Sequence, residues 1–182
     1  MSSSLLSLLA LTAAACIVPT GVALAQPAPD VAAHDIPQSL RVEHEETMDR
    51  LTVLAKRPGV VGAAATRALA LFKAHTQREQ DYIMPPLTLL PQLADGKVTP
   101  DMAWAMAMTD KVKADREQIF QEHVAVTDVL NDLYAAGEKA HDAEAMAFAR
   151  SAATDSLNDI EMLEPTVMLI GEYLHSKLPA AQ

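Results

Sequence analysis

The stretch LFKAHTQREQDYIMPP, from Leu71 to Pro86, indicates both how this chain folds and where its chemistry lies. It places His75 and Glu79 four residues apart, and residues at that spacing lie one above the other on the same face of an α-helix. An imidazole and a carboxylate arranged in this way can both reach one metal ion. Pro86 lacks a backbone N–H and Pro85 disfavours helical geometry before it, so the helix should end about there.

The composition favours one helical domain and argues against nucleic acid as a partner. The 182 residues are 50% hydrophobic, poor in Gly and rich in Ala, Leu and Met, which favour helix. The formal net charge of −10 repels phosphates, whose attraction dominates binding to DNA or RNA. The sequence has no Ser-His-Asp arrangement, phosphate-binding glycine loop or nucleotide motif, so we assign no catalytic residue.

The first residues are typical of a secretory signal. Residues 1–25 carry no charged side chain, and Ala23-Leu24-Ala25 before Gln26 fits the small-x-small cleavage pattern. We therefore expect a signal peptide over 1–25, cleaved after Ala25, and a periplasmic or secreted protein. A lipoprotein site at Cys16 and an uncleaved membrane anchor are the alternatives. No other segment approaches the ~20 apolar residues of a membrane span.

Cys16 is the only cysteine and lies inside this signal. The mature protein would therefore have no thiol, and any metal ligands must be His, Asp or Glu.

Apolar periodicity predicts four long helices after a flexible lead-in over 26–35: about 38–56, 60–84, 101–136 and 141–175. A proline-containing connection over 85–100 holds a short helical turn near 87–90. Gly137 should end the third helix and Pro165 should kink the fourth. The stripe of the fourth helix comprises Phe148, Ala152, Asp155, Asp159 and Met162. Together these elements predict an all-α, antiparallel, up-down four-helix bundle over 36–178.

The two halves of the chain repeat one another. Glu43-His44 and Glu122-His123 lie 79 residues apart, and each opens a Glu-His-x-x-x-x-Asp-x-Leu string. The same shift maps Pro58 onto Gly137, so the turns should correspond. After the turn the shift becomes 80, which maps Pro85 onto Pro165, His75 onto Asp155 and Glu79 onto Asp159. We therefore expect two tandem helical hairpins whose polar residues meet at one level of the bundle.

This repeat predicts a metal site in the core. Six residues are candidate ligands: His44, His75, Glu79, His123, Asp155 and Asp159. Burying three imidazoles and three carboxylates without a cation would cost several kcal/mol for each unpaired ion. Mixed imidazole and carboxylate ligands suit iron or manganese, and they also accept zinc. The alternative is a metal-free ion-pair network in which Arg116, two turns before His123, pairs with a carboxylate.

The same residues resemble the hemerythrin-like (HHE cation-binding) family over about 36–178. The resemblance is carried by the Glu43-His44 helix, the His75-x-x-x-Glu79 helix, the Glu122-His123 helix and the segment MLEPTVMLIGEYL over 162–174. It implies a four-helix bundle around a non-haem, usually di-iron, site that serves oxygen binding or oxygen, nitric oxide or iron sensing and handling. His44, His75, Glu79 and His123 match its ligand positions.

Two departures separate this chain from the oxygen carriers of that family. Asp155 and Asp159 stand where the fourth helix of the family has His and then Glu. Ile119 and Thr127 stand where the carriers have a second histidine on the third helix. The resulting set resembles carboxylate-rich di-iron sites in other bundles.

The leading hypothesis is an exported protein that binds one or two non-haem iron ions and, through them, O2 or NO, for oxygen or redox sensing or iron handling. One alternative is a metal-free bundle that acts as an interaction or stress protein. Another is a di-iron oxidase or peroxidase. His34, His141 and His175 have no partner in the repeat and are expected at the surface.

Overall fold

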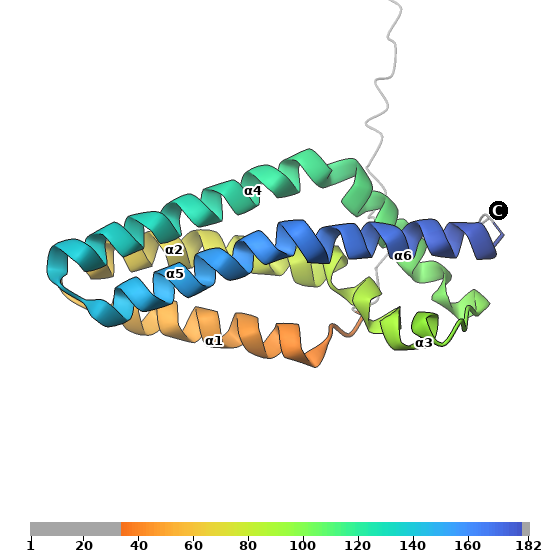
Figure 1. Ribbon diagram of the computed structural model, residues 1–182, viewed down its shortest axis with the longest axis horizontal. Coiled ribbons are helices and arrows are strands. Elements are labelled where there is room, and N and C mark those ends of the chain that lie inside the picture. Colours follow the sequence, from red (N-terminus) through yellow and green to blue (C-terminus); the bar gives the residue numbers. More distant parts are fainter. Residues whose placement is uncertain (1–33, 180–182) are drawn as a thin grey trace, which may run out of the picture. The chain divides into compact units, whose positions relative to one another are not determined.

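The computed structural model describes residues 34–179, and their regular elements are all helical (Figure 1). For this part of the chain, the prediction of an all-α fold is confirmed. The signal peptide expected over 1–25 lies outside the described residues, as does the lead-in over 26–35 except for its last two residues. Within the described part, no helix combines the length and the hydropathy that a membrane crossing needs.

The chain forms a helical bundle with short extra turns at one end. The long helices are α1 (Gln38–Ala55), α2 (Gly59–Arg78), α4 (Trp104–Ala140), α5 (Ala143–Asn158) and α6 (Glu164–Lys177). Single π-helical turns follow α2 at Glu79–Ile83 and α5 at Asp159–Leu163. The connection between α2 and α4 contains a 3-10 turn (Pro85–Leu89), the short α3 (Leu90–Ala94) and a second 3-10 turn (Pro100–Ala103).

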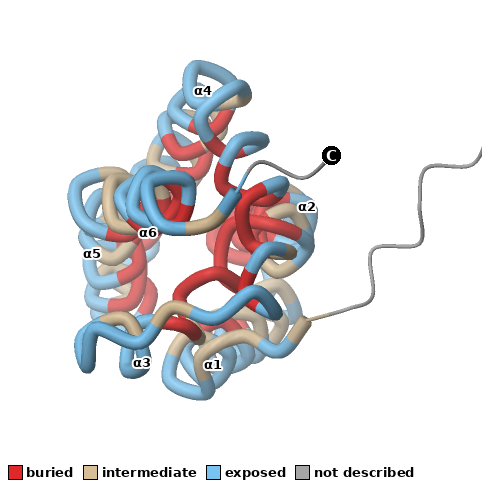
Figure 2. Tube along the Cα trace, turned by 90° about the vertical axis from the view of Figure 1, so that its right-hand side faces the viewer, coloured by how far each residue is buried: buried red, intermediate tan, exposed pale blue. Residues whose placement is uncertain are grey.

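Two apolar clusters fill the bundle, one on each side of a polar layer. One cluster includes Leu51, Phe72 and Leu130, and the other includes Tyr82 and Ile119. Figure 2 shows the buried residues on the sides of the helices that face one another. Along α2 and α4 the polar residues fall between these two clusters in sequence, so the polar layer has apolar walls above and below it.

The two π turns occupy equivalent places in the two halves of the chain. Glu79–Ile83 and Asp159–Leu163 are related by the same shift of 80 that the repeat predicts, and Pro85 and Pro165 follow them at the same distance. In each turn a backbone N–H bonds the carbonyl five residues earlier, as Met84 N–H does to Glu79 O at 2.8 Å. A π turn therefore contains one residue more than an α turn.

That extra residue changes which side chains face the core after Asp159. The expected stripe placed Met162 inside, but Met162 is 68% exposed. Its neighbours Leu163 and Glu164 are buried instead. The prediction for Met162 was wrong because it assumed regular α-helical spacing through the turn.

The end of α4 also differs from the expectation. Gly137 does not end the helix: α4 continues to Ala140, and His141 adopts the left-handed conformation (φ 55°) that ends it. Gly137 is buried, and a Cβ placed on it would lie 2.9 Å from Cγ of Met146 in α5. Close approach of α5 therefore explains this glycine, and the two turns do not correspond at a shift of 79.

The surface expectation holds for His141 and His175, which are exposed, but not for His34. The His34 ring stacks on Trp104 with centroids 3.7 Å apart, which leaves it partly buried.

Candidate metal centre

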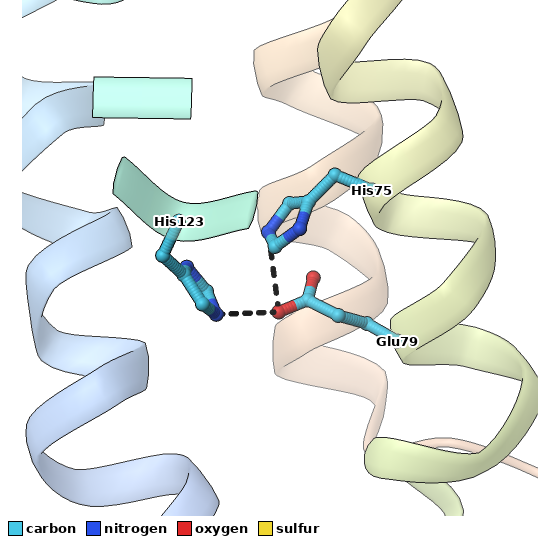
Figure 3. A group of neighbouring side chains, drawn as sticks. All are labelled: His75, Glu79 and His123. Carbon is cyan, nitrogen blue, oxygen red and sulfur yellow. Dashed lines mark ion pairs between the residues drawn. The ribbon is translucent and has the colours of Figure 1, made fainter. Parts of the chain in front are cut away.

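Three buried side chains converge at the polar layer (Figure 3). His75 lies in the last turn of α2, Glu79 begins the π turn that follows, and His123 lies in the middle of α4. One ligand atom from each residue lies within 4.8 Å of the others. Oε1 of Glu79 is 3.4 Å from Nε2 of His75 and 3.8 Å from Nε2 of His123. This arrangement could hold a metal ion.

His44 and Glu164 extend the group, His44 through Glu79 and Glu164 through His123. Nε2 of His44, on α1, lies 3.4 Å from Oε2 of Glu79. Oε1 of Glu164, the first residue of α6, lies 3.4 Å from Nε2 of His123. The carboxylate of Glu79 thus lies between histidines of three different helices, with its side chain only 1% exposed.

Several of these atoms lack the partners that buried polar atoms normally have. Within residues 34–179, both oxygens of Glu79, Nε2 of His123 and Oε1 of Glu164 are buried without a hydrogen-bond partner. Each such atom costs about 1–3 kcal/mol, and more when it is charged. Because these four atoms belong to neighbouring side chains, one or two cations placed among them would satisfy all of them. The donor set therefore fits a metal.

A second contact fixes the ring of His123. Its Nδ1 lies 3.2 Å from Oγ of Ser156, a buried residue of α5. When Nδ1 donates to that hydroxyl, Nε2 keeps a free lone pair, which is the tautomer that a metal ligand needs.

The ring of His44 is held by an aromatic contact. Phe72 packs edge-on against His44, with ring centroids 5.7 Å apart.

Burial keeps the three histidines neutral. It lowers the pKa of His44 and His123 to about 4 and that of His75 to about 3. For His75 the neighbouring His123 and His44 contribute to the same shift. At neutral pH these imidazoles are therefore uncharged and able to coordinate a cation.

The carboxyl groups shift in the opposite direction. Burial raises the pKa of Asp159 and of Glu164 to about 7, and it raises the pKa of Glu79 well above its usual range. The nearby carboxylates of Glu43 and Asp155 add to the shift of Asp159. Without a cation, the raised pKa values favour the protonated, neutral form of these carboxyl groups. A bound cation would favour their ionised form.

The two predicted aspartates are not among the three residues whose ligand atoms converge. Asp155 and Asp159 line a small cavity of about 10 Å³ together with His44 and His75. That volume has room for about one water molecule or ion. Both aspartates are half-buried.

The alternative network around Arg116 has no support in the described residues. Arg116 is exposed, and no ion pair joins it to a carboxylate within residues 34–179. Its charge does reach Glu164, whose pKa it lowers against the larger effect of burial.

Glu164 is the residue that sequence reasoning missed. The repeat does not indicate it, because a shift of 80 aligns Glu164 with Met84, a fully buried apolar residue. One signal was available: Glu164 is the only charged residue on the stripe that continues through Val167, Ile170 and Leu174.

Comparison with protein-family models, with curated proteins and with solved structures finds no match to this chain.

Proposed function

We propose that this protein is a hemerythrin-like, antiparallel up-down four-helix bundle that binds non-haem iron in its core. The ligands would be His44, His75, Glu79 and His123, joined by Glu164 and Asp159. Imidazole nitrogens mixed with carboxylate oxygens suit iron first, then manganese and zinc. Asp155, at the outer edge of the small cavity, is outside this set.

One observation carries the proposal: the two oxygens of Glu79, Nε2 of His123 and Oε1 of Glu164 are buried together without partners. A core that served only packing would not gain from this arrangement, because apolar residues of similar size are at least as stabilising as buried ionisable groups. A divalent cation removes the cost and explains why three helices each contribute a histidine.

Iron held by such ligands would supply a one-electron redox couple, and its ferrous form would bind O2 or NO. Together with the resemblance stated above and the expected signal peptide, this favours oxygen or redox sensing, or iron handling, outside the cytoplasm. The protein's own groups would keep the imidazoles neutral, exclude bulk water with the two apolar clusters and hold Glu79 between the histidines.

The test is metal content after anaerobic loading of the purified protein with ferrous iron and removal of unbound iron. We expect one or two iron ions per chain, and loss of that iron in His75→Ala because a buried ligand is deleted. His175→Ala is the matched control, since His175 is exposed and its Nε2 pairs with Asp110 at 2.9 Å, and neither residue is among the proposed ligands.

Absence of iron from the wild-type protein, with no loss of stability on adding a chelator, would leave the metal-free bundle as the better reading. Parallel loading with manganese and zinc ranks the metals by retained content. Sustained consumption of O2 in the presence of a reductant would assign an oxidase instead of a sensor.

A further inference from the structure

An acidic groove runs along the seam between α1 and α5. It has a volume of about 400 Å³, and its lining includes four carboxylates and one cation, Arg50; one of the carboxylates, Glu144, is also paired with Arg57. The four acidic residues are Glu43 and Glu46 of α1 and Glu144 and Asp155 of α5. α1 packs mainly on α2 and contacts α5 only slightly, so this seam is the loosely packed side of α1.

The groove continues into the small cavity beside the metal centre. Glu43, Thr47, Ala152 and Asp155 line both hollows. Deeper in, the walls of the small cavity include Asp159, His44 and His75. The side chain of His44 is only 7% exposed, and its Nδ1 has no hydrogen-bond partner within the described residues. The walls therefore change from carboxylate oxygens in the groove to the buried imidazole nitrogens of His44 and His75 in the cavity.

We propose that the groove between α1 and α5 is the route by which a divalent cation reaches the core, with Glu43 and Asp155 capturing it at the throat. This inference rests on the proposed function. Carboxylates are good ligands for divalent cations that still carry water, and a cleft lined by one sign of charge raises the rate at which the opposite charge arrives. The route gives Asp155 a part in uptake, which fits its half-buried position.

A second groove offers a rival route and a matched control. It lies between α1 and α2, has a volume of about 450 Å³ and is lined by Glu45, Asp49 and Lys73. It touches His44 but shares no other wall residue with the small cavity. Substituting Glu45 and Asp49 removes two negative charges, as substituting Glu43 and Asp155 does, but from a different groove.

The experiment follows cobalt(II) binding to metal-free protein by stopped-flow absorbance, since cobalt ligand-field bands report coordination directly. For Glu43→Gln with Asp155→Asn we expect the association rate constant to fall roughly 10-fold at low salt. The difference should shrink near 0.5 M salt because exposed charges are then screened. The number of cobalt ions bound at equilibrium should not change. Glu45→Gln with Asp49→Asn should load at close to the wild-type rate.

A steric variant separates a passage from a ligand. Thr47→Phe narrows the throat, so cobalt uptake and its removal by a chelator should slow by the same factor while the equilibrium affinity stays constant. Far-UV circular dichroism checks that the bundle remains folded.

The inference is overturned if the Glu43/Asp155 variant loads at the wild-type rate, if the Glu45/Asp49 control slows equally, or if the Glu43/Asp155 variant binds fewer cobalt ions. A wild-type protein that binds no cobalt overturns the proposed function as well.

Discussion

Glu164 shows at the scale of one residue what the polar layer requires. Its side chain is buried beside His123, yet its Oε1 accepts no hydrogen bond within residues 34–179. Burial raises its pKa to about 7, so in the metal-free protein this carboxyl holds its proton to about neutral pH. The group is therefore costly above neutrality unless a cation is present.

This makes the stability that the buried carboxyl groups contribute to the metal-free protein dependent on pH in a defined direction. Asp159 and Glu164 keep their protons to about pH 7 in the folded state, whereas an unfolded chain loses them near pH 4. The folded state thus binds more protons between about pH 4 and 7, so these two groups lower the free energy of unfolding as pH rises through that range, and their contribution levels off above it. The three buried histidines act in the opposite direction below about pH 7.5, because an unfolded chain still protonates part of its imidazoles there and the folded state does not. The effect of the carboxyl groups is therefore measured as a difference between the wild type and a carboxyl variant.

Urea unfolding at several pH values measures the slope of the unfolding free energy against pH, to which a half-titrated Glu164 contributes about 0.7 kcal/mol per pH unit near pH 7. Glu164→Gln should remove that contribution, because the amide cannot titrate, while Asp159 continues to titrate. Glu172→Gln is the control, since that exposed carboxylate pairs with Lys113 and its pKa is lowered. Equal slopes in the wild type and Glu164→Gln would mean that Glu164 is not the group that titrates.

At the scale of the element, the π turns determine which residues reach the core. Asp159 and Glu164 are five residues apart, a spacing that in an α-helix would place them on different faces. The wider turn brings both toward the site, and the equivalent turn does the same for Glu79 and Met84. The second half of the chain thus has a carboxylate where the first half has an apolar residue.

Deleting one residue from the second π turn tests whether the turn only accommodates an extra residue in the helix or is itself needed to position the ligands. Removal of Met162 leaves Asp159 and Glu164 four apart, on one face of a regular α-helix. Pro165→Ala must accompany the deletion, because a proline ring inside a continuous helix clashes with the carbonyl four residues earlier. We expect retained metal binding and a thermal midpoint lowered by no more than about 4 °C, which corresponds to about 1 kcal/mol.

Removing Ala153 from the regular part of α5 is the control for that deletion. It should rotate every later residue by about 100° and abolish metal binding, because Asp159 and Glu164 would leave the core. Loss of metal from the Met162 variant, with its helical content unchanged, would show that the π geometry itself positions the ligands.

The helices themselves could be predicted from the sequence because their apolar spacing is regular. His44, His75, Glu79 and His123 were found together because each lies on a helix whose α-helical phase is unbroken up to that residue. The repeat supplied the level at which they meet. This part of the site depends only on local periodicity and chain order.

The remaining features depend on contacts that periodicity does not contain. A pattern with 3.6 residues per turn cannot indicate a π turn, so it predicts a buried Met162 and does not predict a buried Glu164. A local preference of glycine for helix ends predicts that α4 ends at Gly137, whereas the glycine is required by the approach of Met146 from another helix. Both errors arise where tertiary packing overrides a local preference.

At the scale of the whole molecule, the polar layer contains residues from helices that differ in how extensively they pack against their neighbours. α1 packs mainly on α2, while α4 packs against α2, α5 and α6. His44 is the one candidate ligand on α1, and it meets Glu79 at the centre of the layer. A cation held by His44 together with residues of α2 and α4 would therefore fasten α1 to the rest of the bundle.

Hydrogen exchange measured by mass spectrometry can resolve this fastening helix by helix. A ligand that binds only the folded state at 100 times its Kd stabilises it by about 2.7 kcal/mol, or roughly 100-fold in exchange rate for amides that need global unfolding. We expect metal to slow exchange throughout α4, and in α1 as well, because opening α1 would break the bond to His44. In His44→Ala the slowing should persist in α4 and disappear from α1. His175→Ala should behave as the wild type does, because His175 lies on the exposed side of α6. Equal protection of α1 in the wild type and in His44→Ala would place His44 outside the coordination sphere and leave α1 held by packing alone.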